Sequence, residues 1–280
     1  MSLGIFLIVL FAAFLHALWN AIVKGAGDRT MVLGLVALGH VVPGLFLALY
    51  YGAPDPAAFP YVVGTTVIHW GYYVLLNIAY RTGDLSVVYP IARGLAPVLI
   101  ALGAVVWADE YLPALAWIGI FAVSAGILLL ARQAVTGEVA KTGLIAATGV
   151  AVVIASYSLV DGIGVRVSGN PGGYIGWIFV AEIFVVLYVF GTRWSRFRQM
   201  SGRAVWVGFI GGLVSSAAYG LVLLAKTEAP LGIVSALRET SVIFAALIGV
   251  LWFSEGPRRD RLLAAVIVAI GIGVISIAKV

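Results

Sequence analysis

The chain has 280 residues, of which 62% are hydrophobic and 10% are charged, and its formal net charge is +5. Soluble domains are typically about 45–50% apolar and about 25% charged, so the composition excludes a soluble domain and predicts a protein that crosses a membrane repeatedly. There is no cysteine, which excludes disulfides and thiolate metal sites. The basic residues lie in short segments between apolar stretches, a pattern typical of membrane topology rather than of a nucleic-acid partner.

Ten apolar stretches follow one another along the chain, each about 20 residues long, the length at which a helix crosses a bilayer. They are 3–23, 31–51, 58–80, 85–107, 111–131, 143–164, 172–191, 204–225, 230–253 and 262–279. The first begins at Leu3 with neither a basic n-region nor a cleavage site, so it is predicted to be a span and not a signal peptide. No phosphate-binding loop motif occurs, which argues against an ATP-driven pump. The pattern predicts an all-α membrane protein of ten transmembrane helices.

Lysine and arginine are distributed unevenly between the two sides of the membrane. If the first loop is cytoplasmic, twelve basic residues lie on that side, and only Arg166, Lys226 and Lys279 lie on the other. The remaining two, Arg93 and Arg238, fall within spans. Because basic loops stay in the cytoplasm, we expect both termini on the non-cytoplasmic side of a bacterial inner (plasma) membrane.

The two halves of the chain resemble each other when one is shifted by 145 residues, or by 141 near the start of each half. The aligned pairs are VVWADE (105–110) with VLWFSE (250–255), Arg93 with Arg238, His16 with Tyr157, and Asn20 with Asp161. We therefore expect two five-helix repeats, 1–135 and 136–280, within a single membrane domain. Since five is odd, the second repeat inserts upside down, which is the inverted-repeat plan of secondary transporters with their site near the midplane.

A longer motif at the end of the first half carries a family resemblance. The segment PIARGLAPVLIALGAVVWADEYLPALAWIGIFAVSAGILLLAR (90–132), with Glu110 and its counterpart Glu255, resembles EamA-type members of the drug/metabolite transporter superfamily. The resemblance implies export of amino acids and other metabolites through a cavity lined by the first, third, fourth, sixth, eighth and ninth spans. The aromatic residues make the chain most similar to YddG-type aromatic amino-acid exporters, although His16 stands where the family often has tryptophan, with Trp19 one turn on.

Arg93 lies in the apolar stretch VVYPIARGLAPVLI (87–100), between Pro90 and Pro97. A charge at bilayer depth costs at least about 2.5–3.5 kcal/mol, so either the arginines snorkel or brace neighbouring helices, or they face the cavity and meet a substrate carboxylate. The prolines predict a kink in this first copy. Arg238 has Glu239 beside it and no adjacent proline, so we expect Arg238 to be the more structural arginine and Arg93 the one that meets substrate.

The third span carries a polar stripe, since its residues at 69, 73, 77 and 80 share one helical face. The stripe either lines the cavity or makes interhelical hydrogen bonds. Tyr73, Tyr80, Tyr157 and Tyr219 are expected to contact substrate through their rings. The candidate substrate-binding residues are His16, Asn20, His69, Tyr73, Asn77, Tyr80, Tyr89, Arg93, Tyr157, Asp161, Tyr219, Ser235 and Arg238. The three histidines lack metal-ligand spacing, so we expect no metal, no cofactor and no catalytic residue.

These patterns favour a secondary transporter that exports small amphipathic metabolites, above all amino acids including aromatic ones, by alternating access. The alternative is an exporter of cationic drugs or guanidinium-like compounds, which requires a membrane carboxylate from among Asp161, Glu182 and Glu239. A membrane enzyme or scaffold without transport is a remote alternative. The expected partners are a small-molecule substrate and the lipid bilayer. We expect a monomer, although the pairs Gly208–Gly212 and Gly172–Gly176 suit either packing within the bundle or a dimer face.

Overall fold

The structure is a computed structural model that describes residues 1–24, 27–82, 85–134, 141–253 and 259–278. Within these ranges every regular element is helical, in agreement with the predicted all-α class. The elements are α1 (Leu3–Val23), α2 (Arg29–Tyr51), the 3₁₀ helix η1 (Pro56–Ala58), α3 (Phe59–Thr82), α4 (Leu85–Trp107), α5 (Ala114–Ala134), α6 (Lys141–Val167), α7 (Pro171–Ala181), α8 (Ile183–Arg198), α9 (Gly202–Glu228), α10 (Leu231–Arg238), α11 (Ser241–Phe253) and α12 (Arg259–Ile277).

Each of the ten predicted stretches contains a helix or a pair of helices. Within the described residues, eight segments are long and apolar enough to cross a membrane, and they include the interrupted pairs α7–α8 and α10–α11. A further apolar helix, Arg261–Ile277 in α12, is shorter than these, and α3 has 24 residues. The many apolar helices indicate a multi-pass membrane protein.

Several helices begin at a side chain that caps their first turn. Ser2 Oγ accepts from the amide of Ile5, and Asn170 Oδ1 accepts from the amide of Gly173 just after Pro171. Asp28 and Ser201 cap α2 and α9 in the same way. Because the first amides of a helix have no partner within it, such caps fix where the helix starts.

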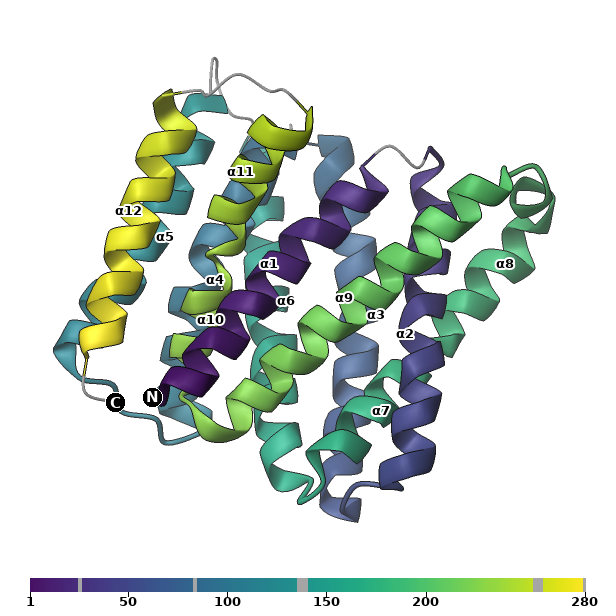
Figure 1. Ribbon diagram of the computed structural model, residues 1–280, viewed down its shortest axis with the longest axis horizontal. Coiled ribbons are helices and arrows are strands. Elements are labelled where there is room, and N and C mark those ends of the chain that lie inside the picture. Colours follow the sequence, from purple (N-terminus) through teal and green to yellow (C-terminus); the bar gives the residue numbers. More distant parts are fainter. Residues whose placement is uncertain (25–26, 83–84, 135–140, 254–258, 279–280) are drawn as a thin grey trace.

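Glycines allow the helices to pack with their backbones close together. A Cβ atom on Gly39 of α2 would lie 2.6 Å from the Cα atom of Gly212 in α9, and one on Gly176 of α7 would lie 2.6 Å from the amide nitrogen of Ala48 in α2. A Cβ on Gly119 of α5 would lie 2.8 Å from a carbonyl oxygen of α12. These contacts hold α2 against α7 and α9, and α5 against α12 (Figure 1).

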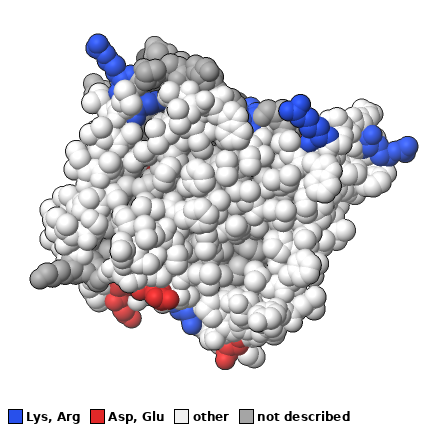
Figure 2. Space-filling view, viewed as in Figure 1, with Lys and Arg blue, Asp and Glu red and all other residues white. Residues whose placement is uncertain are grey.

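The two ends of the bundle differ in charge. The N- and C-termini lie at the same end (Figure 1). Figure 2 shows most of the visible lysine and arginine side chains at the opposite end, while the visible acidic side chains lie at the end of the termini. The visible face therefore has the charge asymmetry expected from the distribution of basic residues in the sequence.

The helix of Arg238, the counterpart of Arg93, contains a break that the sequence did not predict. Helix α4 runs without a break through both of its prolines, whereas α10 ends at Arg238 and α11 begins at Ser241. The amides of Glu239 and Thr240 donate to carbonyls three residues earlier, at 3.1 and 3.0 Å. A shift from four-residue to three-residue hydrogen bonding tightens the turn and ends the helix, and it needs no proline.

Candidate functional site

The two arginines predicted within spans share one carboxylate. Glu239, between α10 and α11, places Oε2 3.0 Å from Nη2 of Arg93 in α4, and Oε1 3.9 Å from Nη2 of Arg238. The Arg93 guanidinium also donates to Ser241 Oγ at 3.3 Å. Arg93 and Arg238 are each 5% exposed and Glu239 is 1% exposed. This charge cluster, Arg93–Glu239–Arg238, braces α4 against the α10–α11 junction in the interior of the bundle.

The pairing within the charge cluster differs from the sequence expectation. Arg238, with Glu239 beside it in sequence, was expected to be the more structural arginine, but the carboxylate is nearer to Arg93. At a helix end the side chains of consecutive residues diverge, so the closer cation comes from another helix. Two arginines and one carboxylate leave an excess of one positive charge, and the Nε atoms of both arginines are buried without a hydrogen-bond partner in the described part of the chain.

An aromatic group lies beside the charge cluster, with Tyr157 of α6 at its centre. The ring centroid of Tyr157 is 4.4 Å from that of His69, 6.1 Å from that of Tyr72 and 6.4 Å from that of Tyr219. Tyr72, Tyr157 and the partly exposed Tyr89 lie close enough to Arg93 to act on its charge. The structure thus brings together residues of α3, α6 and α9, including Tyr72, which the sequence analysis did not select.

His16 of α1 lies in the same region of the bundle as the charge cluster. Its ring lies within electrostatic range of both arginines. The indole Nε1 of Trp19 donates to His16 Nδ1 at 3.3 Å, and the two rings meet edge to face. Asn20 shares this helix face, but it is exposed and its side chain donates to the carbonyl of His16 at 2.7 Å. The polar group of Asn20 is therefore engaged by its own helix.

Asp161 forms a second buried polar group, separate from the charge cluster. Its carboxylate is 0% exposed and accepts hydrogen bonds from the hydroxyl groups of Tyr174, at 3.1 Å, and Tyr219. Tyr174 was missed by sequence reasoning, because α7 meets α6 only through tertiary packing and no periodicity links the two positions. Ser235, another candidate, is 2% exposed within α10.

The predicted span boundaries placed Lys226 in a loop, but the structure places it inside a helix. Helix α9 continues to Glu228, and Lys226 is 1% exposed with its Nζ donating to the carbonyl of Ser158 in α6 at 2.8 Å. The predicted boundary was too early because the residues from 226 onward look polar in sequence, although the fold buries the first of them.

A clasp of charged and backbone groups joins the two halves at the end of the molecule that holds the termini. Glu110 pairs with Arg166 at 2.6 Å and accepts from the amide of Leu231 at 2.7 Å. Arg166 in turn donates to the carbonyls of Lys226, at 2.7 Å, and Ala229, at 2.9 Å. The Glu110–Arg166 clasp therefore ties the α4–α5 connection to α6, to the end of α9 and to the start of α10.

Part of the predicted stripe cannot be placed. The side chains of Tyr73, Asn77 and Tyr80 lie outside the described residues, as does Glu255. In the same stripe, His69 Nδ1 lies 2.8 Å from the carbonyl of Thr65, one turn earlier.

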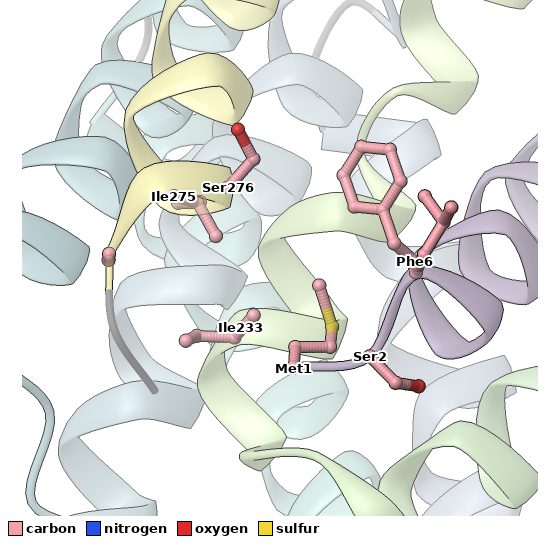
Figure 3. Close-up of a pocket in the computed structure, with 8 residues that line it drawn as sticks. Met1, Ser2, Phe6, Ile233, Ile275 and Ser276 are labelled. Carbon is pink, nitrogen blue, oxygen red and sulfur yellow. The ribbon is translucent and has the colours of Figure 1, made fainter.

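A pocket of about 310 Å³ opens near the N-terminus and contains none of the predicted site residues. Figure 3 shows that the N-terminal segment forms one side of it and α10 and α12 the other, with Met1, Ser2, Phe6, Ile233, Ile275 and Ser276 around it. Since this lining has no charged side chain, the charge cluster and its aromatic neighbours remain the stronger candidate site.

Comparisons with known proteins agree with this architecture. Residues 141–277 match the EamA-like transporter family. One solved structure, a crystal structure of a protein, is 18% identical in sequence and has the same fold, with a TM-score of 0.75 over 98% of this chain and 98% of its own. No protein with a curated function matches the sequence. The second half of the chain is thus similar to the EamA-like transporter family, whose members are membrane transporters of small molecules.

Proposed function

We propose that the whole chain is a secondary transporter that exports amino acids, including aromatic ones, by alternating access between two inverted five-helix repeats. The observation that carries the proposal is the charge cluster: an excess positive charge, buried in an apolar bundle beside the rings around Tyr157. A guanidinium is a suitable partner for a carboxylate. Intramembrane charges of this kind usually mark a substrate pathway.

The helix packing supports the two repeats. Under the predicted equivalence α1 corresponds to α6 and α3 to α9, and the contact of α1 with α9 has its counterpart in that of α6 with α3. Helix α4 packs on α6 as α10 and α11 pack on α1. The pairs α5–α12 and α2–α7 each join equivalent helices from the two halves.

In the proposed cycle the substrate carboxylate pairs with a guanidinium while Glu239 remains the shared counter-ion. The ring of an aromatic substrate packs among His69, Tyr72 and Tyr157, where edge-to-face and offset contacts add to the apolar area buried. The end of the molecule that holds the termini opens only when Glu110 and Arg166 separate, because their clasp joins the two halves there.

The proposal places both termini on the non-cytoplasmic side of a bacterial inner membrane. Support comes from the basic residues, which lie mostly at the end of the visible face opposite to the termini (Figures 1 and 2). A reporter that is active only in the cytoplasm, fused after Val280, should stay inactive. An active reporter contradicts the orientation.

We propose that the transporter works as a monomer. Its glycine pairs are occupied within the bundle: Gly208 meets Leu35, Gly212 meets Gly39, and Gly172 meets Tyr51. Light scattering of the purified protein in detergent checks the mass, and a dimer would contradict this part of the proposal.

Substrate flux in proteoliposomes tests the function. A panel of amino acids, assayed with and without an imposed pH gradient, should show uptake above that of empty vesicles and also reveal the energy coupling. Tyr157→Ala should reduce flux of bulky aromatic amino acids more than that of small ones, because the ring lies beside the charge cluster. Tyr188→Ala is the matched control, since Tyr188 is 51% exposed on α8. An equal loss for all substrates in Tyr157→Ala would indicate damaged folding instead.

A further inference from the structure

We infer that the site recognises its substrate through the carboxylate alone, so that aromatic hydroxy acids without an amino group are transported as well, and aromatic amines are not. This inference rests on the proposed function and specifies its substrate class as monocarboxylates with an apolar or aromatic body.

The charge cluster itself provides for one anion. Glu239 neutralises one of the two guanidinium groups, and the remaining positive charge is balanced by a single substrate carboxylate. Arg93 and Arg238 are each 95% buried, as their 5% exposure implies, and each has a buried Nε without an acceptor in the described part of the chain. Buried donors of this kind are rare unless a ligand or water completes them, so both arginines still have hydrogen bonds to offer to a substrate.

In the part of the chain that the structure describes, an ammonium group finds no free carboxylate inside the bundle. Among the described residues, three carboxylates inside the bundle are already engaged: Asp161 by Tyr174 and Tyr219, Glu182 by His40 at 3.0 Å, and Glu239 by the two arginines. At the end of the bundle, Glu110 is held by Arg166. Among the described residues, the amino group of a substrate would therefore meet ring faces and neutral oxygens instead of a free carboxylate, and ring faces attract cations weakly where water remains.

This arrangement also argues against export of organic cations. A cation beside Arg93 and Arg238 meets an excess of like charge, and Asp161, with 0% exposure, is enclosed by its tyrosine partners. Burying an ammonium without a counter-ion carries a desolvation penalty. A hydroxyl group in the place of the ammonium avoids that penalty, so the hydroxy acid should be transported at least as readily as the amino acid.

Three probes with the same ring test the inference: phenylalanine, phenyllactate with a hydroxyl in place of the ammonium, and phenethylamine without the carboxylate. Counterflow into proteoliposomes, corrected with empty vesicles for passive leakage, should give rates for phenylalanine and phenyllactate within about threefold of each other. Phenethylamine should be at least tenfold slower.

Each other outcome has a separate meaning. Transport of phenylalanine without phenyllactate overturns the inference and leaves the proposed function intact, because the ammonium is then required. Transport of phenethylamine overturns it in favour of a cation site. Transport of none of the three contradicts the proposed function itself.

Asp161→Asn sharpens the test, because Asp161 is the carboxylate on α6 nearest to the aromatic group through Tyr219. The ratio of phenylalanine to phenyllactate flux should stay unchanged, even if both rates fall with the amount of folded protein. A selective loss of phenylalanine flux identifies Asp161 as an ammonium partner and contradicts the inference. Glu228→Gln, at an exposed position at the end of α9, is the matched control.

Discussion

The helix that carries each buried arginine is constructed differently in the two halves. Helix α4 remains one helix although Pro90 and Pro97 lie inside it, whereas its counterpart is divided into α10 and α11 without an internal proline. Because proline has no amide hydrogen, Pro97 offers no bond to the carbonyl of Arg93, four residues earlier.

In the second half the carbonyl of the arginine also lacks its regular helical partner, here because the pattern of backbone hydrogen bonds changes. The amide of Val242, four residues after Arg238, donates to the carbonyl of Glu239 at 3.0 Å. In both halves the carbonyl of the arginine loses the partner that a regular helix would give it. Free backbone groups at this depth are tolerated where they are surrounded by protein or line water. In both halves, therefore, a buried arginine coincides with a break in the backbone hydrogen bonding of its helix. Only the cause of the break differs between the two halves.

Removing the shared carboxylate should have the largest effect on this pair of helices. Glu239→Gln leaves two buried guanidinium groups without a counter-ion, and breaking a buried ion pair costs roughly 3–5 kcal/mol. We expect a sharp drop in folded protein and in the melting temperature in detergent. The double variant Glu239→Gln/Arg238→Gln should recover part of the loss. Melting temperatures equal to that of the parent would show that the carboxylate is not the counter-ion.

The next largest effect should be the loss of stability on replacing either arginine, and this loss should differ between the two. Arg93→Gln removes the ion pair with Glu239 at 3.0 Å, and charged contacts of this kind are worth about 1.5–3 kcal/mol. Arg238→Gln removes a contact at 3.9 Å, beyond hydrogen-bond distance, and should destabilise less. Thermal unfolding of both variants in the same detergent checks the order, which is the reverse of the sequence expectation. Flux of carboxylate substrates should fall in both.

Restoring the missing amide in α4 should have a smaller effect, with the opposite sign for stability. Pro97→Ala supplies an N–H for the carbonyl of Arg93, so we expect a gain below the roughly 3 kcal/mol that proline costs inside a helix, together with slower transport. Pro90→Ala serves as the comparison, since it changes a carbonyl outside the charge cluster. A Pro97→Ala variant with unchanged flux would separate the backbone feature from function.

The smallest effect concerns the hydroxyl at the start of α11. Ser241→Ala removes the hydrogen bond from Arg93 at 3.3 Å and leaves the ion pair with Glu239, so the loss should lie at or below the lower end of the roughly 1.5–3 kcal/mol of a hydrogen bond to a charged group, because this bond is long. Ser276→Ala is a matched control, because its exposed hydroxyl donates to the carbonyl of Gly273 in its own helix, α12. A loss as large as that of Arg93→Gln would mean that Ser241 contributes more than this one hydrogen bond.

The sequence was sufficient to predict the helices and the position of both arginines in the interior of the bundle. The bilayer sets the length of an apolar span, so each predicted stretch contains a helix. A charge between apolar residues is too costly to face lipid, so Arg93 and Arg238 were expected to have partners or water. His16, His69, Tyr157 and Tyr219 were also selected from their helix faces, and the structure gathers them near the charge cluster.

The choice of partners could not be predicted. The structure places Glu239 closer to Arg93 than to Arg238, and it places Tyr174 against Asp161. Both contacts depend on how separate helices rotate against one another, and one sequence contains no signal for this rotation. The division between α10 and α11 was missed because no proline or glycine marks it. The engagement of Glu182 by His40 likewise appears only when α2 is packed on α7 and α8.

The buried Lys226 has a consequence for how the protein is synthesised. Its ammonium group is bonded to the carbonyl of Ser158 in α6, and a lysine that faces lipid carries an insertion cost, which is about 2.5–3.5 kcal/mol at the bilayer centre and smaller near the end of a helix, where Lys226 lies. Because the chain leaves the ribosome from its N-terminus, α6 is already in place when α9 enters the membrane. A circular permutant in which α9 precedes α6 would present this lysine to lipid before its acceptor exists, and its membrane insertion should be correspondingly less efficient.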